Sequence, residues 1–310
     1  MPVAQLQPKE YVQSVPLHHA AIPSKAEALT YTRWLATHHY ENFHIVGFLL
    51  PKDLHQDFYN VYSFCRWADD LGDEIEDPAE SLRLLEWWRR ELQGMYRGEA
   101  GHPVFVALAD TVQRHGIPAE PFERLIRAFE QDQTVTRYQT FEQVFDYCVY
   151  SANPVGHLVL YLCGYRDAER RRLSDYTCTA LQLANFWQDV AVDLGKGRVY
   201  LPLDLLDKHG YSVEELRALR FNKNFESLMR EAVRVAEELF HKGLPLLDTV
   251  NRRLALDLEL FSRGGLKVLD KIREQGYNVL TRRPRISKAE RVAILLRCLP
   301  RLLPRPTPFR

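Results

Sequence analysis

Four polar residues between positions 182 and 193 recur at the spacing of one helical face. Gln182, Asn185, Asp189 and Asp193 follow one another at steps of three, four and four residues, which places their side chains on the same side of a helix. Two carboxylates four residues apart weaken a helix by about 0.2–0.5 kcal/mol. Since this stripe contains no Lys or Arg, we expect a bound cation to offset the repulsion. Mg2+ is the natural candidate, because it prefers oxygen ligands.

A second polar stripe stands more than a hundred residues earlier in the chain. It consists of Tyr62, Arg66, Asp69 and Asp73, at steps of four, three and four residues. Its two carboxylates again share one helical face, with the arginine one turn before them. If the two helices face each other, four carboxylates line one cavity and can bridge Mg2+ ions, which complete their coordination with substrate phosphate and water. This pattern predicts the ionisation of a diphosphate ester.

Residues beside the two stripes have a simpler interpretation. Asp70 and Glu74 lie off the face that carries the first pair of carboxylates, so we expect them to be secondary. Trp67 and Trp187 flank the stripes, and we interpret them as core packing rather than as groups that stabilise a cation.

The composition indicates an ordinary globular protein of the cytoplasm. The 310 residues include 41 basic and 41 acidic side chains, so no broad basic field for nucleic acid is expected. The five cysteines are scattered, without the spacing of a zinc or redox motif, which suits a reducing compartment. No apolar run approaches the roughly 20 residues of a spanning helix, and the first residues lack a signal pattern.

Gly and Pro residues divide the chain into segments with helical periodicity, which predicts an all-α fold. We expect an irregular arm over residues 1–24, one helical domain over 25–300 and a basic, Pro-rich tail over 301–310. The expected helices cover residues 25–40, 53–75, 79–96, 103–115, 119–132, 224–249, 251–276 and 287–299, with others starting near 141 and 167. Pro154 is expected to kink the helix that starts near residue 141.

The C-terminal segment from Arg282 to Arg310 is rich in Arg and Leu and contains one acid, Glu290. A basic amphipathic segment of this kind can lie on an anionic membrane, at the inner face in a cytoplasmic protein. A closing helix with a solvated basic face is an alternative of at least equal weight. The oligomeric state is left open by the sequence.

Around both stripes, the sequence resembles the squalene/phytoene synthase family of head-to-head prenyl synthases over nearly the whole chain. The matching motifs are Tyr62-x-Phe-Cys-Arg66-x-x-Asp69-Asp70-x-x-Asp73-Glu74, Asn185-x-x-x-Asp189-Val-x-x-Asp193 and Gly197-Arg198-x-Tyr200-Leu-Pro202. The resemblance implies a single isoprenoid-synthase domain, with helices around a central cavity, and a Mg2+-dependent reaction on a prenyl diphosphate.

The resemblance also implies roles for individual positions. The metal-binding residues would be Asp69, Asp73, Asn185, Asp189 and Asp193. The diphosphate contacts would be His39, Arg66, Arg198 and Arg282, with Gln182 beside the second motif and the cavity tyrosines Tyr62 and Tyr147. The isoprenoid channel would be lined by Phe43, Ala152, Val155 and Gly156.

Several departures from the family pattern narrow the expected reaction. Gln188 replaces the usual Arg before the second motif, Glu41-Asn42-Phe43 replaces Ser-x-Ser-Phe, Asn153-Pro154 precedes Val155-Gly156, and Gly265 replaces a tyrosine. These features resemble the bacterial hopanoid-pathway branch of the family, whose reaction converts presqualene diphosphate into hydroxysqualene. Asn42, Asn153 and Gln188 are the candidates for positioning the water.

Three alternatives stay open. The first is the earlier step, in which two farnesyl diphosphates are joined into presqualene diphosphate, and the second is a reductive squalene synthase or a carotenoid-type synthase. The chain contains no Gly-x-Gly-x-x-Gly motif at the start of a strand–helix unit, which argues only weakly against a nicotinamide cofactor. The third is a non-catalytic isoprenoid-binding protein, against which the four intact aspartates argue.

Overall fold

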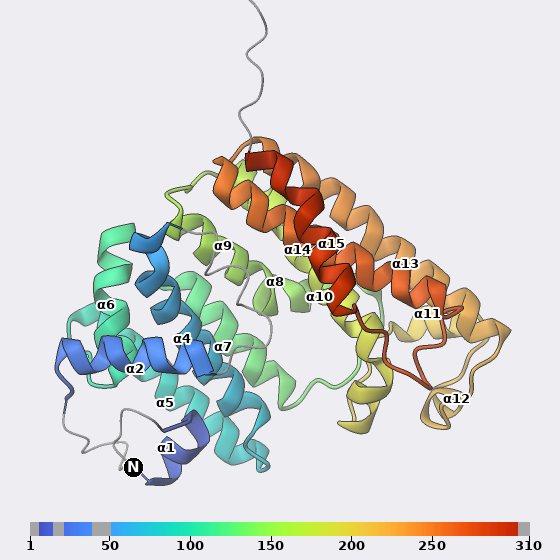
Figure 1. The fold of residues 1–310 in the computed structure, drawn as a ribbon. Helices are drawn as coiled ribbons and strands as arrows, with labels where there is room; N and C mark the ends of the chain where they lie inside the picture. The colour runs from blue at the N-terminus through green and yellow to red at the C-terminus, as the bar shows by residue number, and fades with distance from the viewer. Residues whose placement is uncertain (1–5, 15–21, 39–50, 303–310) are drawn as a thin grey trace, which may run out of the picture. The chain divides into compact units, whose positions relative to one another are not determined.

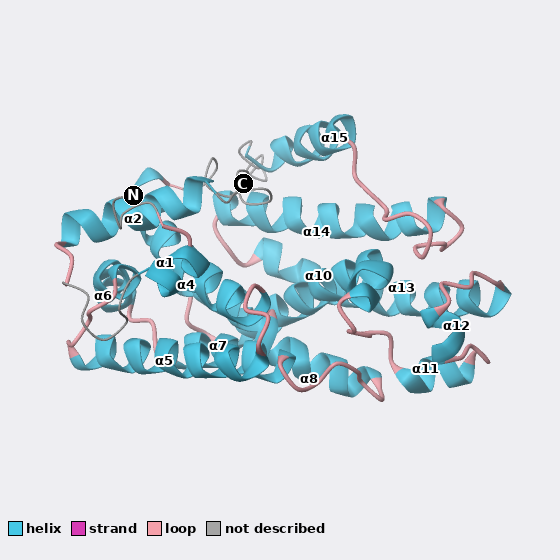
Figure 2. Cartoon of the chain, turned by 90° about the horizontal axis from the view of Figure 1, so that it is seen from below, coloured by secondary structure: helices cyan, strands magenta, loops and turns pink. Residues whose placement is uncertain are grey.

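The computed structural model describes residues 6–14, 22–38 and 51–302, and within these ranges the chain consists of helices joined by loops (Figure 2). No strand occurs in the described ranges, where an isolated bridge pairs Arg137 with Val199. The all-α class is therefore confirmed. Contacts divide the chain into two compact units, one of Met1–Val135 and Pro154–Arg166, the other of Thr136–Asn153 and Asp167–Arg310. The predicted division into an arm, one domain and a tail stays a prediction.

The described helices of the first unit are arranged around α4, which contacts α1, α2, α5, α6 and α7 (Figure 1). They are α1 (Pro8–Ser14), α2 (Lys25–His38), η2 (Lys52–Leu54), α4 (His55–Asp73), α5 (Pro78–Arg97), α6 (Pro103–His115), α7 (Glu120–Asp132) and α9 (Asn153–Leu162), whose first residue belongs to the second unit.

Local sequence signals set where these helices begin. Ser24 and Glu27 cap α2 reciprocally: the Ser24 backbone N–H donates to the Glu27 carboxylate over 2.8 Å, and the Glu27 N–H donates to Ser24 Oγ over 3.4 Å. Asp77 caps α5, whose first residue is a proline. A missing N–H is harmless at that position, because it has no intrahelical partner.

An aromatic cluster holds α4 in place. Trp67 is fully buried and stacks on Trp88 of α5 with ring centroids 4.9 Å apart, and its Nε1 donates to the Tyr31 hydroxyl over 3.0 Å. His102 meets Trp67 edge-on, and burial lowers the pKa of this imidazole to about 3, so the ring stays neutral. Since α4 buries this face among aromatic rings, its opposite face is left to Asp69 and Asp73.

The central helix of the second unit is α10, which packs against α8, α13 and α14. Figures 1 and 2 show α13 and α14 running beside it. The described helices of this unit are α8 (Phe141–Ser151), α10 (Ala168–Gly195), α11 (Leu203–Lys208), α12 (Val213–Arg217), α13 (Lys223–Gly243), η3 (Leu244–Asp248), α14 (Arg252–Glu274), α15 (Lys288–Cys298) and η4 (Leu299–Leu302).

Two glycines let these helices approach one another closely. A Cβ at Gly265 of α14 would lie 2.2 Å from Cζ of Phe240 on α13, and one at Gly243 would lie 3.0 Å from the backbone nitrogen of Thr177 on α10. Packed interiors have no room for such overlaps. Position 265, where the resemblance suggests a lost tyrosine, therefore requires glycine for packing in this chain.

Pro154 does not kink a continuous helix, and that prediction is wrong. Helix α8 ends at Ser151 and α9 begins at Asn153. The proline therefore takes the second position of a new helix, where no hydrogen-bond donor is needed. Ala152, between the helices, is the C-cap of α8 and donates its N–H to the Cys148 carbonyl over 3.0 Å.

Candidate active site

The first stripe lies on α4, as its spacing predicts. Asp69 is half-exposed, with 46% of its side chain accessible, whereas Asp70 is buried at 6%. Arg66 lies between them: its Nη1 donates to Asp69 Oδ2 over 3.4 Å, and its Nη2 forms an ion pair with Asp70 Oδ1. Asp73, one turn further along, is exposed. A single guanidinium thus contacts Asp69 of this stripe and the neighbouring Asp70.

Asp70 is buried and paired with Arg66, and its expected secondary role stays a prediction. Burial raises the pKa of its carboxyl to about 7, and the nearby Arg66 guanidinium opposes that rise. Burial likewise raises the pKa of Tyr62, one turn before Arg66. The spacing of Arg66 and Asp70, four residues apart on a helix, was the available signal for this pair.

The second stripe lies on α10, where Gln182, Asp189 and Asp193 are half-buried and Asn185 is exposed. The opposite face of this helix is buried in the second unit and includes Trp187, which is fully buried. The expected helical face is therefore present. That it faces the first stripe across a common cavity stays a prediction.

An arginine that the sequence analysis did not select pairs with this stripe. The Nε and Nη2 of Arg283 donate to the two carboxylate oxygens of Asp189, the second over 2.8 Å. Hydrogen bonding to Asp189 and the negative charge of Asp193 raise the pKa of Arg283, against the opposing effect of partial burial. The repulsion between the two carboxylates is therefore offset by a cation of the chain itself.

The backbone next to Arg283 is hydrogen-bonded to α10 through Gln188, the residue directly before Asp189. Gln188 is buried, and its Nε2 donates to the Pro284 carbonyl over 2.5 Å. This amide therefore fixes the segment after α14, and its predicted contact with substrate or water stays a prediction.

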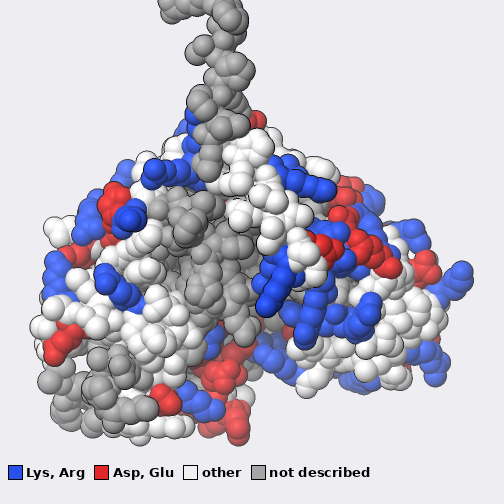
Figure 3. Space-filling model, in the orientation of Figure 1, with Lys and Arg blue, Asp and Glu red and all other residues white. Residues whose placement is uncertain are grey.

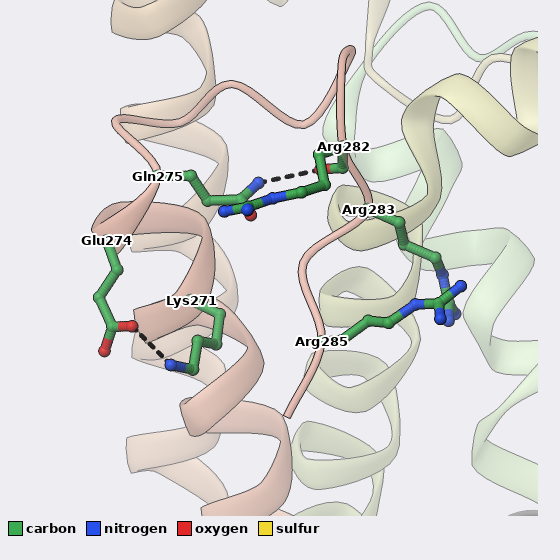
Figure 4. Close-up of a pocket in the computed structure, with 6 residues that line it drawn as sticks. All are labelled: Lys271, Glu274, Gln275, Arg282, Arg283 and Arg285. Atoms are coloured by element: carbon green, nitrogen blue, oxygen red, sulfur yellow. Dashed lines mark hydrogen bonds and ion pairs between the residues drawn. The ribbon is translucent and has the colours of Figure 1, made fainter. Parts of the chain in front are cut away.

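The same segment forms one wall of a pocket of about 600 Å3 (Figure 4). The pocket is lined by Lys271, Glu274, Gln275, Arg282, Arg283 and Arg285. Figure 4 shows the Arg282 side chain directed toward the end of α14, and the Arg283 side chain directed to the other side of the segment. With four cationic side chains and one carboxylate, the lining suits an anionic ligand such as a diphosphate.

The loop after α10 brings aromatic rings to the end of the stripe. Gly197 turns the chain with a φ of 78°, and the Arg198 N–H donates to the Asp193 carbonyl over 2.9 Å. Tyr200 then stacks on Phe186 with ring centroids 3.7 Å apart, and Tyr147 lies 5.8 Å from Tyr200. These rings and Arg198 therefore lie in one neighbourhood of the second unit.

A small cavity of about 10 Å3 lies against this cluster, lined by Phe186, Asp193, Arg198 and Tyr200 among others. Its volume is close to the minimum that one water molecule needs.

The structure does not place six further predicted residues at these groups. Ala152 is buried in the second unit, whereas Val155 and Gly156 belong to α9 in the first, with Val155 exposed. His39, Asn42 and Phe43 lie outside the described residues. The roles assigned to all six stay predictions.

The residues present fit Mg2+ in its phosphate-sharing mode. In the part of the chain that the structure describes, no three His, Cys, Asp or Glu side chains gather closely enough to hold a metal by themselves. Mg2+ in phosphate-binding sites often takes only one or two carboxylates from the protein. Asp69 with Asp73, and Asp189 with Asp193 and Asn185, offer such oxygen donors on half-buried or exposed helical faces.

The chain is similar in sequence and in fold to known prenyl synthases. A model of the squalene/phytoene synthase family matches residues 36–290. The chain is 42% identical to the solved squalene synthase HpnC from Alicyclobacillus acidocaldarius, with a TM-score of 0.79 over 86% of this chain and 98% of that one. The predicted isoprenoid-synthase fold is therefore confirmed.

Relatives of different activities have similar identities to the chain. A hydroxysqualene synthase from Sinorhizobium fredii is 35% identical, over 69% of this chain and 73% of its own length. A phytoene synthase from Thermus thermophilus is 34% identical, over 83% of this chain and 87% of its own length.

Proposed function

Because the chain belongs to the squalene/phytoene synthase family, we propose that it ionises presqualene diphosphate with Mg2+ and lets water capture the cation, giving hydroxysqualene. The observation that carries this proposal is the end of α10, where Asp189 and Asp193 lie beside Arg283, one of the arginines that line the cationic pocket. Carboxylates for a divalent cation and guanidinium groups for a diphosphate are the two elements that such an ionisation needs.

The basic residues bind and orient the diphosphate. Arg282, Arg283 and Arg285 line the pocket, and Arg198 lies just after the C-terminal end of α10, next to Asp193. Guanidinium groups form paired, charge-assisted hydrogen bonds with phosphate oxygens, and these strengthen as the leaving group gains charge. Bound Mg2+ would supply Lewis-acid stabilisation of the same leaving group.

The aromatic residues provide the environment for the hydrocarbon cation. Tyr138, Tyr147, Phe186 and Tyr200 are nearly fully buried beside the end of the stripe. The faces of aromatic rings attract cations, and buried rings also exclude bulk water. One water molecule then adds its oxygen to the cation and loses a proton, so that the products are an alcohol and diphosphate.

The alternatives differ in substrate and in the need for a reductant. Condensation of two farnesyl diphosphates would give presqualene diphosphate, and reductive squalene formation would require NADPH. The relatives include synthases of more than one kind, so identity alone does not separate these reactions.

Product analysis separates them. Purified protein with Mg2+ would receive presqualene diphosphate or farnesyl diphosphate, each with and without NADPH. We expect hydroxysqualene from presqualene diphosphate without NADPH. Conversion of farnesyl diphosphate to presqualene diphosphate would favour the earlier step, and squalene formed only with NADPH would favour the reductive synthase. No turnover of any substrate would favour a non-catalytic isoprenoid-binding protein.

We also propose that the protein acts in the cytoplasm at an anionic membrane surface, through α15. None of the described helices is both long and apolar enough to cross a bilayer. Val292, Leu296 and Leu299 follow one another at steps of four and three residues, and are 55%, 59% and 39% exposed. This apolar stripe, on α15 and the first residue of η4, is accompanied by the exposed cations Lys288, Arg291 and Arg297.

The distribution of charge supports contact with the membrane through this stripe. Glu290, the only acid of α15, forms an ion pair with Lys271 of α14 over 2.5 Å. In Figure 3, Lys and Arg side chains gather around the N-terminal end of α15, and the surface along its middle is largely uncharged. An apolar stripe with basic flanks suits the headgroup region of an anionic bilayer.

A further inference from the structure

The side chain of Arg283 lies where a cation is needed. Its guanidinium hydrogen-bonds to both oxygens of Asp189, and it is also close enough to Asp193 for that charge to act on it. Arg283 comes from the segment between α14 and α15, 94 residues after its partner. The cation that offsets the acidic stripe thus comes from a different element of the fold.

The backbone of this segment is held, whereas the side chain is accessible. Gln188 binds the Pro284 carbonyl, and Gln275 Nε2 donates to the carbonyls of Asn278 and Arg282 over 3.1 and 3.0 Å. The side chain of Arg283 is 43% exposed, against 22% for that of Asp189. The guanidinium can therefore leave its partner without movement of the main chain.

Arg283 also lines the cationic pocket, so it has two possible partners. We propose that Arg283 is an exchangeable counter-ion: it pairs with Asp189 when no divalent cation is bound, and it binds the diphosphate when the cation takes that carboxylate. This inference rests on the proposed function, since it assumes a divalent cation at Asp189.

The exchange makes the binding of metal and diphosphate cooperative. A divalent cation that binds alone must displace the guanidinium and then lie beside its charge, which weakens binding. A diphosphate removes this penalty, because it accepts hydrogen bonds from the displaced guanidinium. By linkage, whatever the diphosphate adds to metal affinity, the metal adds to diphosphate affinity. The cation is then held tightly only with its substrate.

The test uses the full chain with Mn2+, followed by electron paramagnetic resonance, with and without inorganic diphosphate. In Arg283→Gln we expect Mn2+ alone to bind about two- to fivefold more tightly, as expected for loss of a partly exposed ion pair. Diphosphate binding in the presence of Mn2+, measured by calorimetry, should become weaker. The affinities of Arg283→Lys should lie between those of the parent protein and those of Arg283→Gln, because lysine keeps the charge without the paired hydrogen bonds.

Arg282→Gln is the matched control, because it removes the same charge from the adjacent residue, whose side chain points toward α14 (Figure 4). It should leave the affinity for Mn2+ alone nearly unchanged. A purely structural role for Arg283 would weaken both ligands together and lower the melting temperature. Unchanged Mn2+ affinity in Arg283→Gln would overturn the inference.

Asp189→Asn separates this inference from the proposed function. If that variant binds Mn2+ as well as the parent does, the metal site itself is wrong. If Asp189→Asn loses Mn2+ and Arg283→Gln binds it like the parent, the metal site stands and the exchange is wrong.

Discussion

Asp69 and Asp189 are the residues at which the proposed chemistry is most directly tested. Each of them pairs with an arginine. Asn has nearly the same shape as Asp, so the substitution removes the charge with little other change. We expect Asp69→Asn and Asp189→Asn each to lower turnover by about 100-fold or more, since a carboxylate that would hold Mg2+ against the leaving group is lost. The free energy of unfolding should change by less than about 1 kcal/mol, because both ion pairs are partly exposed.

Asp204→Asn, at an exposed position of α11, is a suitable control for these variants and should retain activity. Turnover would be measured by product formation, and folding by circular dichroism. Near-normal turnover in both Asp69→Asn and Asp189→Asn would reject the metal assignment.

The types and spacing of the stripe residues were predictable, whereas their partners were not. Helical periodicity alone places Asp189 and Asp193 on one face, and the structure has them there. The pairing of Asp189 with Arg283 depends on how the segment after α14 packs against α10, 94 residues away. The resemblance pointed to Arg282 as a diphosphate contact and gave no role to Arg283. Only the packing distinguishes them.

At the scale of elements, a buried carboxylate joins α4 to α6. Asp57 of α4 is 2% exposed and accepts hydrogen bonds from Thr111 Oγ1 over 2.7 Å, Arg114 Nη1 over 2.9 Å and His115 Nε2 over 2.9 Å. Removing one member of such a network leaves the others unpaired. We expect Asp57→Ala to lower the free energy of unfolding by about 3–5 kcal/mol.

Asp53→Ala is the control for this network, since Asp53 is exposed on the preceding η2 turn. It should change stability by less than about 0.5 kcal/mol in the same urea titration. Equal losses in the two variants would show that Asp57 does not join these helices.

Helix α14 contains a buried acid that should lower the stability of the fold, in contrast to Asp57. Asp257 is 2% exposed, and neither carboxylate oxygen has a hydrogen-bond partner among the described residues. Burial raises the pKa of this carboxyl from its usual 3.8 to about 8. The folded state therefore binds more protons than the unfolded state between these values, and the free energy of unfolding should fall as the pH rises through this window.

Asp257→Asn should remove this dependence and raise stability at pH 8 by about 1–3 kcal/mol, with a smaller effect at pH 5. Urea unfolding at the two pH values measures it. Asp270→Asn, which breaks an exposed pair with Arg273 on the same helix, should cost no more than about 1 kcal/mol at either pH. An equal effect of Asp257→Asn at both pH values would contradict the expected titration.

Helix boundaries were predictable where local chemistry sets them. Ser24 with Glu27, and Asp77 before Pro78, are caps that can be found in the sequence, and the helices begin there. Pro154 was not interpreted correctly, because a proline inside a helical pattern either kinks one helix or starts another. Only the end of α8 at Ser151 distinguishes the two.

At the scale of the whole molecule, the chain passes between its two units three times, after Val135, Asn153 and Arg166. No long linker marks these points, and Pro154, at the second of them, was interpreted as a kink within one helix. The all-α class was predictable, because helical periodicity is a local property. Division into units depends on contacts between residues far apart in the sequence.

The proposed membrane contact depends on an uneven distribution of charge in a chain whose net charge is zero. We expect the protein to co-sediment with vesicles of phosphatidylglycerol and phosphatidylcholine, and less as salt is raised, since each surface cation contributes about 1 kcal/mol of screened attraction. Val292→Ser combined with Leu296→Ser should reduce binding at every salt concentration, because it removes apolar area. Lys288→Gln combined with Arg291→Gln should reduce binding mainly at low salt.

Ile22→Ser is the control for these vesicle experiments, because Ile22 is the most exposed large apolar residue among those described and lies far from α15 in the sequence. It should leave co-sedimentation unchanged. Different responses of the apolar and charged pairs would separate insertion of the α15 stripe from simple electrostatic attraction. If neither pair changes binding, or if the parent protein stays in the supernatant, α15 is a closing helix with a solvated basic face, and access to a lipid substrate must be explained by another surface.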